Sequence, residues 1–234
     1  MIEIYTIQLD SPICQDEFQR LLQHVSEERR ARILRYRHYD DACRSLAGDL
    51  LIRYALKKTF GLSDSELRFG KSPQGKPILL SQPEYHFNLS HSGSHIVAGV
   101  GLLPLGVDVE IVRSIDFKVA KRFFSEEEYL FIVHQPFDDG LWSFFKLWTL
   151  KESFVKAIGS GLRIPLNSYR FEFAEDIRLI SSDFGNDRFA FHQLLLEDAV
   201  LSACVCLPRE SHLCIRDVEF VQRTMDIDIL SSDF

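Results

Sequence analysis

Apolar and polar residues alternate at the start of the chain and then change to a helical spacing. Ile2 and Ile4 have polar neighbours, which is the pattern of a half-buried strand, so a strand is predicted over residues 2–9. Apolar side chains that recur every three or four residues predict helices over 15–36 and 40–60. Short connections rich in Gly, Pro and Ser favour antiparallel neighbours for the strands predicted next, near 86–90, 95–102 and 105–111.

The second half of the chain repeats this order of elements. Helical spacing predicts helices over 114–134 and 141–159. Four strands are predicted to follow, near 168–174, 189–196, 199–206 and 213–219. The plan is an α+β fold in which each half packs helices on a small antiparallel sheet. We expect an N-terminal half over 1–103, a C-terminal half over 104–224 and a loose tail over 225–234.

The composition narrows the class of protein. The 234 residues carry a net charge of −7, which argues against a general nucleic-acid binder, because such proteins neutralise phosphates with an excess of basic side chains. No stretch reaches the roughly 18 apolar residues of a membrane span, and the start lacks a signal-peptide pattern. The five cysteines have no metal-site spacing, which favours reduced thiols. A cytoplasmic protein is expected, one that binds neither membrane nor nucleic acid.

Two acidic residues lie two positions apart in the segment GVDVEIV. On a strand, Asp108 and Glu110 point to the same side, while Val107 and Val109 face the core. Neighbouring carboxylates repel each other and raise each other's pKa, so a cation between them favours the ionised pair. Oxygen ligands suit a hard ion, above all Mg²⁺, which also bridges substrate phosphates. Taken alone, the same alternation is typical of a solvated strand face.

The segment LWTLKESFVKAIGSGL has apolar residues almost all round a helix, which indicates burial. Glu152 and Lys156 lie on one helical face, four residues apart, with Lys151 beside them. Charges on a buried helix need partners, and a phosphorylated ligand or a metal would supply them. The alternative is an ordinary intrahelical Glu–Lys pair of small energy.

A predicted strand leads into a polar turn in the segment HFNLSHSG. Ser90 and Ser92 supply hydroxyl groups, and the imidazole of His91 can hydrogen-bond a phosphate. A single histidine in a turn is more often structural. The Gly-x-Ser-x-Gly elbow of serine hydrolases is absent from the sequence.

Arginines and a tight turn add positive charge. Arg29 and Arg32 share one helical face and Arg44 stands near the start of the next helix, and arginine can bind phosphate oxygens through two donors. The turn Gly75-Lys76-Pro77 offers a lysine but lacks the spacing of a P-loop. A charged helix face is often simply solvated. Combined with the carboxylates, lysines and histidine, these residues indicate a site for a ligand with two or three phosphates.

The order of these motifs resembles that of one enzyme family. In sequence come Gly75-Lys76-Pro77, FNLSHS, GVDVE, F-F-S-x-x-E at 123–128 and W-x-x-K-E-S-F-x-K at 148–156. This order resembles the 4′-phosphopantetheinyl transferases, specifically the longer, monomeric type typified by the surfactin synthetase-activating enzyme. The similarity covers roughly residues 1–222, and the pairing of GVDVE with W-x-x-K-E is its most specific part.

The resemblance implies two similar α/β halves related by a pseudo-twofold axis, with coenzyme A and Mg²⁺ between them. It implies an enzyme that transfers 4′-phosphopantetheine from coenzyme A to a serine of an apo carrier protein and releases 3′,5′-ADP. Peptidyl, acyl or aryl carrier domains are the expected partners, as in nonribosomal peptide and antibiotic biosynthesis. They are expected to dock near 159–169 and the strand that follows, on a monomer.

The resemblance also implies a role for each matching residue. Asp108, Glu110 and Glu152 are expected to hold the metal, and Glu152, Lys156 and His91 to form the catalytic set. Whether Glu152 or a metal-bound water takes the proton of the serine stays open. The expected contacts to coenzyme A are Ser90, Lys151 and Lys156 at the phosphates, His91, Arg29, Arg32 and Arg44 around the 3′-phosphate, and Gly75, Lys76 and Pro77 at the adenine.

A few positions depart from the family pattern. Arg29 and Arg32 stand where lysines are known, and Gln74 stands where tyrosine is common. Two other functions share the same features. A non-catalytic module that binds coenzyme A or a carrier should lack Asp108, Glu110, Glu152 or Lys156, and all four are present. A metal-dependent nucleotide phosphohydrolase would use water as the attacking group.

Overall fold

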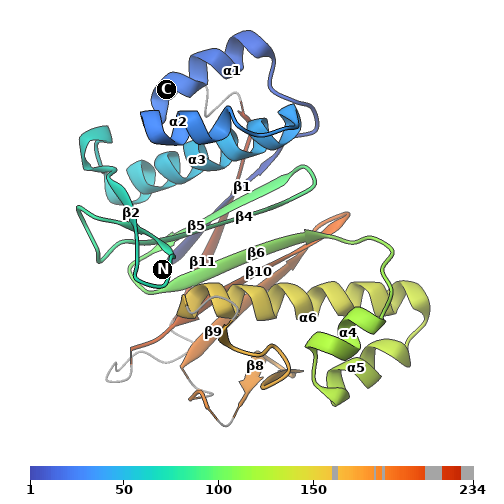
Figure 1. The fold of residues 1–234 in the computed structure, drawn as a ribbon. Coiled ribbons are helices and arrows are strands. Elements are labelled where there is room, and N and C mark those ends of the chain that lie inside the picture. Colours follow the sequence, from blue (N-terminus) through green and yellow to red (C-terminus); the bar gives the residue numbers. More distant parts are fainter. Residues whose placement is uncertain (160–162, 182, 186–187, 209–217, 228–234) are drawn as a thin grey trace.

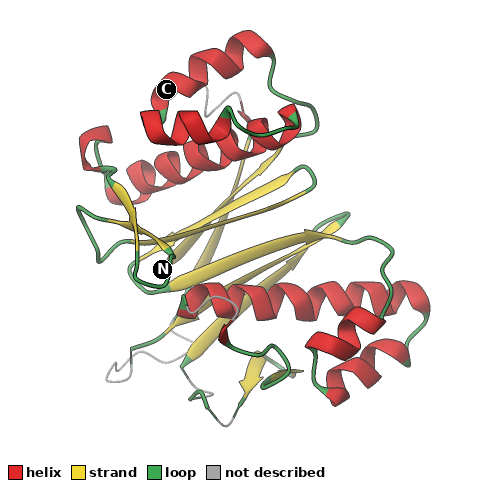
Figure 2. Cartoon of the chain, in the orientation of Figure 1, coloured by secondary structure: helices red, strands yellow, loops and turns green. Residues whose placement is uncertain are grey.

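The computed structural model describes residues 1–159, 163–181, 183–185, 188–208 and 218–227. Helices form the two outer layers and two sheets lie between them (Figure 1). The colouring by secondary structure shows the same arrangement, with the two larger sheets between the helical layers (Figure 2). This arrangement confirms the predicted α+β class. Within the described residues, no helix is long and apolar enough to cross a membrane.

The first half of the chain builds one sheet and the helical layer that covers it. Its elements are β1 (Ile2–Gln8), α1 (Gln15–Leu21), the 3₁₀ turn η1 (Leu22–His24), α2 (Glu27–Ile33), α3 (Tyr39–Phe60), the 3₁₀ turn η2 (Asp64–Glu66), β2 (Phe69–Lys71), β3 (Pro77–Leu79), β4 (His86–Ser92) and β5 (His95–Gly101). Buried apolar side chains of α3 pack on this sheet. Gly61 follows α3 in a left-handed conformation, with φ at 70°, and so ends the helix.

The second half repeats the first element by element. Its elements are β6 (Leu105–Ile111), α4 (Lys118–Phe123), α5 (Glu126–Val133), α6 (Phe137–Ile158), β7 (Arg170–Phe173), β8 (Ile177–Ile180), β9 (Phe189–Leu195) and β10 (Ala199–Cys206). The strand order β6-β10-β9 matches the order β1-β5-β4 of the first half, and each half adds a separate two-stranded ribbon, β2-β3 or β7-β8. The long helix α6 covers the second sheet as α3 covers the first (Figure 1).

A last strand, β11 (Phe220–Met225), returns to the first sheet. It pairs with β1 in parallel, from Ile2 opposite Phe220 to Ile7 opposite Met225, so this sheet is antiparallel except at its edge. The strand predicted over 213–219 falls mostly outside the described residues. Met225 is buried, at 7% exposure, and is therefore not part of a loose tail. The limits of the predicted halves stay a prediction, although residues 220–224 lie in the sheet of the first half.

Two predicted helices are each divided in the structure. The helix predicted over 15–36 is interrupted by η1, and Ser26 then caps α2 by accepting a hydrogen bond from the N–H of Arg29. The helix predicted over 114–134 is divided before α5, where Ser125 and Glu128 form a capping box. The prediction of continuous helices was wrong because these caps begin new helices inside an apolar pattern.

A third apolar core joins the two sheets. It is formed by side chains of β1, β5, β6 and β10, among them Ile4, Val107 and Val109. On its other face β6 lies directly against α6 at Gly106, where a Cβ would be 2.1 Å from the carbonyl oxygen of Ser153. Because only glycine allows this approach, β6 and the last turns of α6 come close enough to share polar side chains.

Candidate active site

Side chains of β4 accept hydrogen bonds from the backbone N–H groups on one edge of β6, an edge that pairs with no strand among the described residues. One edge of β6 pairs with β10, and the N–H groups of the other edge point toward β4. Residues 88, 90 and 92 alternate along β4 with the same period as those N–H groups, so each reaches one of them. The oxygens of Asn88, Ser90 and Ser92 accept from the N–H groups of Val107, Val109 and Ile111 at 2.9, 3.4 and 3.2 Å. The two halves are thus joined beside the acidic residues of β6.

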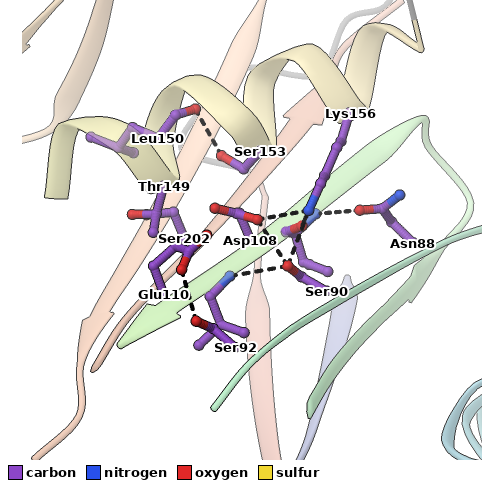
Figure 3. Close-up of polar contacts among 12 residues, drawn as sticks. Asn88, Ser90, Ser92, Asp108, Glu110, Thr149, Leu150, Ser153, Lys156 and Ser202 are labelled. Atoms are coloured by element: carbon purple, nitrogen blue, oxygen red, sulfur yellow. Dashed lines mark hydrogen bonds and ion pairs between the residues drawn. The ribbon is translucent and has the colours of Figure 1, made fainter. Parts of the chain in front are cut away.

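Asp108 is the centre of the polar cluster. Its Oδ1 accepts hydrogen bonds from Ser90 Oγ at 2.8 Å and from Lys156 Nζ at 2.7 Å, and Figure 3 shows the three side chains pointing toward one another. Lys156 Nζ also donates to Ser90 Oγ at 3.0 Å and to the carbonyl of Val107 at 3.1 Å. The structure therefore brings together three predicted site residues from β4, β6 and α6.

Burial decides the electrostatics of Asp108. The residue is 4% exposed, and this burial raises the pKa of its carboxyl group, while the Lys156 ammonium opposes the rise. Its Oδ2 is buried and has no hydrogen-bond partner among the described residues. A buried carboxylate oxygen without a donor is costly, so a cation at Oδ2 would fit this site.

The other two predicted metal ligands lie near Asp108. Glu110 Oε2 accepts a hydrogen bond from Ser92 Oγ at 2.7 Å. Burial raises the pKa of Glu110, the hydrogen bond from Ser92 lowers it, and the negative charge of Asp108 raises it further. Burial and the charge of Asp108 also raise the pKa of Glu152 on α6. Within the described ranges, however, no three His, Cys, Asp or Glu side chains are grouped closely enough to hold a metal ion. The metal triad stays a prediction.

A pocket opens beside this cluster, between the two halves. It has a volume of about 250 Å³, with the 74–77 loop on one side and α6 on the other. A second pocket of about 350 Å³ shares Asn88 and Pro77 with the first and extends to Arg29. The predicted residues Gly75, Lys76, Pro77, Glu152 and Lys156 all line the first pocket. A larger cavity of about 410 Å³, which includes His95 and Asp198, contains none of the predicted residues.

The basic residues lie on the side of the first half. Arg29 forms an ion pair with Asp49 at 3.0 Å at the second pocket, and Arg44 forms an ion pair with Asp41. Burial, then the positive charges of Arg44 and Lys156, lower the pKa of His91, which places His91 within the field of both cations. Arg32 is exposed on α2.

Lys151 does not have the predicted position. It is fully buried, and its Nζ contacts Glu128 Oε2 at 2.9 Å and donates to the carbonyls of Leu166 and Tyr169 at 2.7 and 2.8 Å. The rings of Phe124, Tyr169 and Phe171 surround the ammonium. With its three donors engaged in the core, Lys151 has a structural role, and the predicted contact with coenzyme A is wrong.

Asn88 and Asp49 help to build the site although the motifs did not assign them. Asn88 links β4 to β6 and lines both pockets. Asp49 accepts from Arg53 at 2.7 Å as well as pairing with Arg29. The alternation of Asn88, Ser90 and Ser92 was a visible signal in the sequence, because three polar residues on one strand face need partners.

Comparisons with known proteins place this site in a family. Residues 11–100 match the model of the 4′-phosphopantetheinyl transferase N-terminal domain, and residues 104–204 match that of the 4′-phosphopantetheinyl transferase superfamily. The chain is 37% identical over 175 residues to 4′-phosphopantetheinyl transferase Sfp of Bacillus subtilis (strain 168), covering 75% of this chain and 78% of that protein. It is 38% identical over 169 residues to 4′-phosphopantetheinyl transferase gsp of Aneurinibacillus migulanus, covering 72% of this chain and 70% of that protein.

Because both family models and relatives that are more than 30% identical agree, the chain belongs to the 4′-phosphopantetheinyl transferase superfamily. The predicted family and the predicted enzyme class are confirmed.

Proposed function

We propose that the chain transfers the 4′-phosphopantetheine group of coenzyme A to a serine of an apo carrier protein and requires Mg²⁺. The observation that supports this best is the contact of Asp108, Ser90 and Lys156, within 2.7–3.0 Å of one another, beside a pocket between the halves. A buried carboxylate paired with a lysine at a pocket suits a ligand that brings both phosphates and a metal.

Asp108, Glu110 and Glu152 would hold the metal ion. The buried Asp108 Oδ2 and the raised pKa values of all three carboxyl groups support this assignment, because a cation would lower the cost of ionising them together. When bound, Mg²⁺ would neutralise charge on the phosphate oxygens.

The residues of the chain would then guide the exchange of one phosphorus–oxygen bond for another. The serine oxygen bonds to the β-phosphorus, the anhydride bond breaks, and 3′,5′-ADP leaves with the electron pair. Lys156 is placed to stabilise the charge on the leaving phosphate. Which group takes the serine proton stays open, because a carboxylate that holds the metal ion, as proposed for Glu152, is a weaker base than a free one.

The remaining contacts follow the position of each residue around the pockets. The adenine would lie along Gly75, Lys76 and Pro77, and the 3′-phosphate near His91, Arg44 and the Arg29 and Arg32 side of α2. A peptidyl, acyl or aryl carrier would dock near residues 159–169 and on β7, next to the end of α6, although residues 160–162 lie outside the described residues. We propose that the protein acts as a monomer.

Mass spectrometry of an apo carrier protein tests the function directly. With coenzyme A and Mg²⁺, the enzyme should add about 340 Da, the mass of one phosphopantetheine group, to the carrier. Release of phosphopantetheine without a change in carrier mass would indicate a phosphohydrolase. Binding of coenzyme A without either product would indicate a non-catalytic module. Either of these results would overturn the proposal.

A further inference from the structure

The side chain of Lys76 reaches from the loop of the first half into the second half. Its Nζ donates to the carbonyl oxygens of Leu105 at 2.9 Å, Lys156 at 2.6 Å and Ala157 at 3.1 Å. Leu105 begins β6, and the other two residues are in the last turn of α6. An ammonium group has three N–H donors, and here each has an acceptor in the other half of the chain.

The Lys76 ammonium gives hydrogen bonds to carbonyl groups at the C-terminal end of α6. The last four carbonyl groups of a helix lack partners within the helix and carry partial negative charge, so a lysine there is stabilising. Gly159 follows in a left-handed conformation, with φ at 77°, and a Cβ added to it would be 3.1 Å from Lys76 Cδ. The lysine side chain therefore lies along the helix end and caps it from another part of the chain.

The two segments that Lys76 joins are the two walls of the pocket of about 250 Å³. Glu152 and Lys156 lie on the α6 wall, and the loop of the first half forms the other. A lysine that instead bound a phosphate would have to leave three hydrogen bonds and uncover the carbonyls of α6. The same ammonium cannot serve both purposes at once.

We infer that Lys76 is a positioning residue, which fixes the 72–77 loop against the end of α6 and so sets the width of the pocket, without contacting a phosphate. The inference rests on the proposed function only where it takes coenzyme A as the occupant of the pocket. The contact between the halves itself exists without any ligand.

Hydrogen exchange of the protein without ligand tests the contact. In Lys76→Met, amides in residues 72–77 and 155–158 should exchange about tenfold faster, because three hydrogen bonds to a charged group are lost. Lys71→Met is the matched control, since it removes an exposed lysine from β2, beside the same loop, and it should leave exchange in both segments unchanged. Equal exchange in Lys76→Met and the wild type would overturn the inference. This measurement needs no transferase activity, so it can fail or succeed independently of the proposed function.

Steady-state kinetics then test what the contact does. Lys76→Met should raise KM for coenzyme A about tenfold and leave kcat and the KM for the carrier within about twofold, because the pocket loses order but no group at the phosphates. Lys76→Arg keeps the charge, but a planar guanidinium does not match three converging acceptors, so it should behave like Lys76→Met. Full rescue by arginine would overturn the inference. So would loss of the KM effect with 3′-dephospho-coenzyme A, because that result would assign Lys76 to the 3′-phosphate.

Discussion

Replacing Asp108 by asparagine separates the charge of this side chain from its shape. The amide oxygen of asparagine can still accept from Ser90 and Lys156, as Asp108 Oδ1 does at 2.8 and 2.7 Å. The negative charge, and with it the proposed affinity for a metal ion, is lost. If the carboxylate serves the reaction, Asp108→Asn should fold normally and fail to load a carrier.

The two effects differ clearly in size. Asp108 is 4% exposed, so its charge is costly to bury, and Lys156, with a side chain that is 27% exposed, offsets part of that cost. Because asparagine keeps both hydrogen bonds and water can solvate the partly exposed Lys156 ammonium, we expect Asp108→Asn to change the free energy of unfolding by no more than about 1 kcal/mol. Loss of a charge that acts on the phosphates should lower the rate about 10² to 10⁴-fold, which is about 2.7 to 5.5 kcal/mol of barrier.

Urea denaturation and carrier loading, measured on the same preparation, check both numbers. Asp116→Asn is the matched control, because the Asp116 side chain is 65% exposed and lies away from the cluster, and it should keep full turnover. A turnover of Asp108→Asn within threefold of the wild type, at saturating Mg²⁺ and coenzyme A, would refute the role of the carboxylate. A loss of more than about 3 kcal/mol of stability would show that Asp108 serves mainly the fold.

Three further changes test the packing and the buried charges. Gly106→Ala places a Cβ 2.1 Å from a carbonyl of α6, so urea denaturation should show a loss of about 3 kcal/mol or more, and an unchanged midpoint would contradict the close packing. Lys151→Met leaves the carboxylate of Glu128 buried without its cation and should cost about 3–5 kcal/mol by the same measurement; adding Glu128→Gln should recover part of it, and no recovery would argue against the pair. Burial lowers the pKa of Lys76 from 10.5 to about 8, so between these pH values the unfolded chain binds more protons than the folded one. The free energy of unfolding should therefore rise with pH in this range, by up to about 3 kcal/mol relative to Lys76→Met. Parallel curves of the free energy of unfolding against pH for the two proteins would contradict this.

Local patterns in the sequence were sufficient for the long helices and the central strands. The helices predicted over 40–60 and 141–159 correspond to α3 and α6, because their apolar residues are dense and regular. Ser26 and Ser125 are residue types that commonly begin helices, but the apolar spacing continues across both, so continuous helices were predicted. The pairing of β11 with β1 could not be predicted from local pattern, since it joins residues as far apart in the sequence as Ile2 and Phe220.

The candidate site shows the same limit at the level of single side chains. The alternation on β6 correctly placed Asp108 and Glu110 on one side and Val107 and Val109 in a core. The prediction for Lys151 was wrong because neighbouring residues on a helix point about 100° apart, so Lys151 enters the core while Glu152 faces the pocket. Adjacency in a motif gave no information on that direction.

The return of β11 to β1 has a consequence for biosynthesis. The ribosome releases β1 before β11, so until β11 follows, one edge of β1 has exposed N–H and C=O groups. The first half can close its apolar core around α3, yet its sheet is complete only after β11 has emerged. A shortened chain that stops before Phe220 would keep this open edge permanently, and such edges invite pairing between molecules.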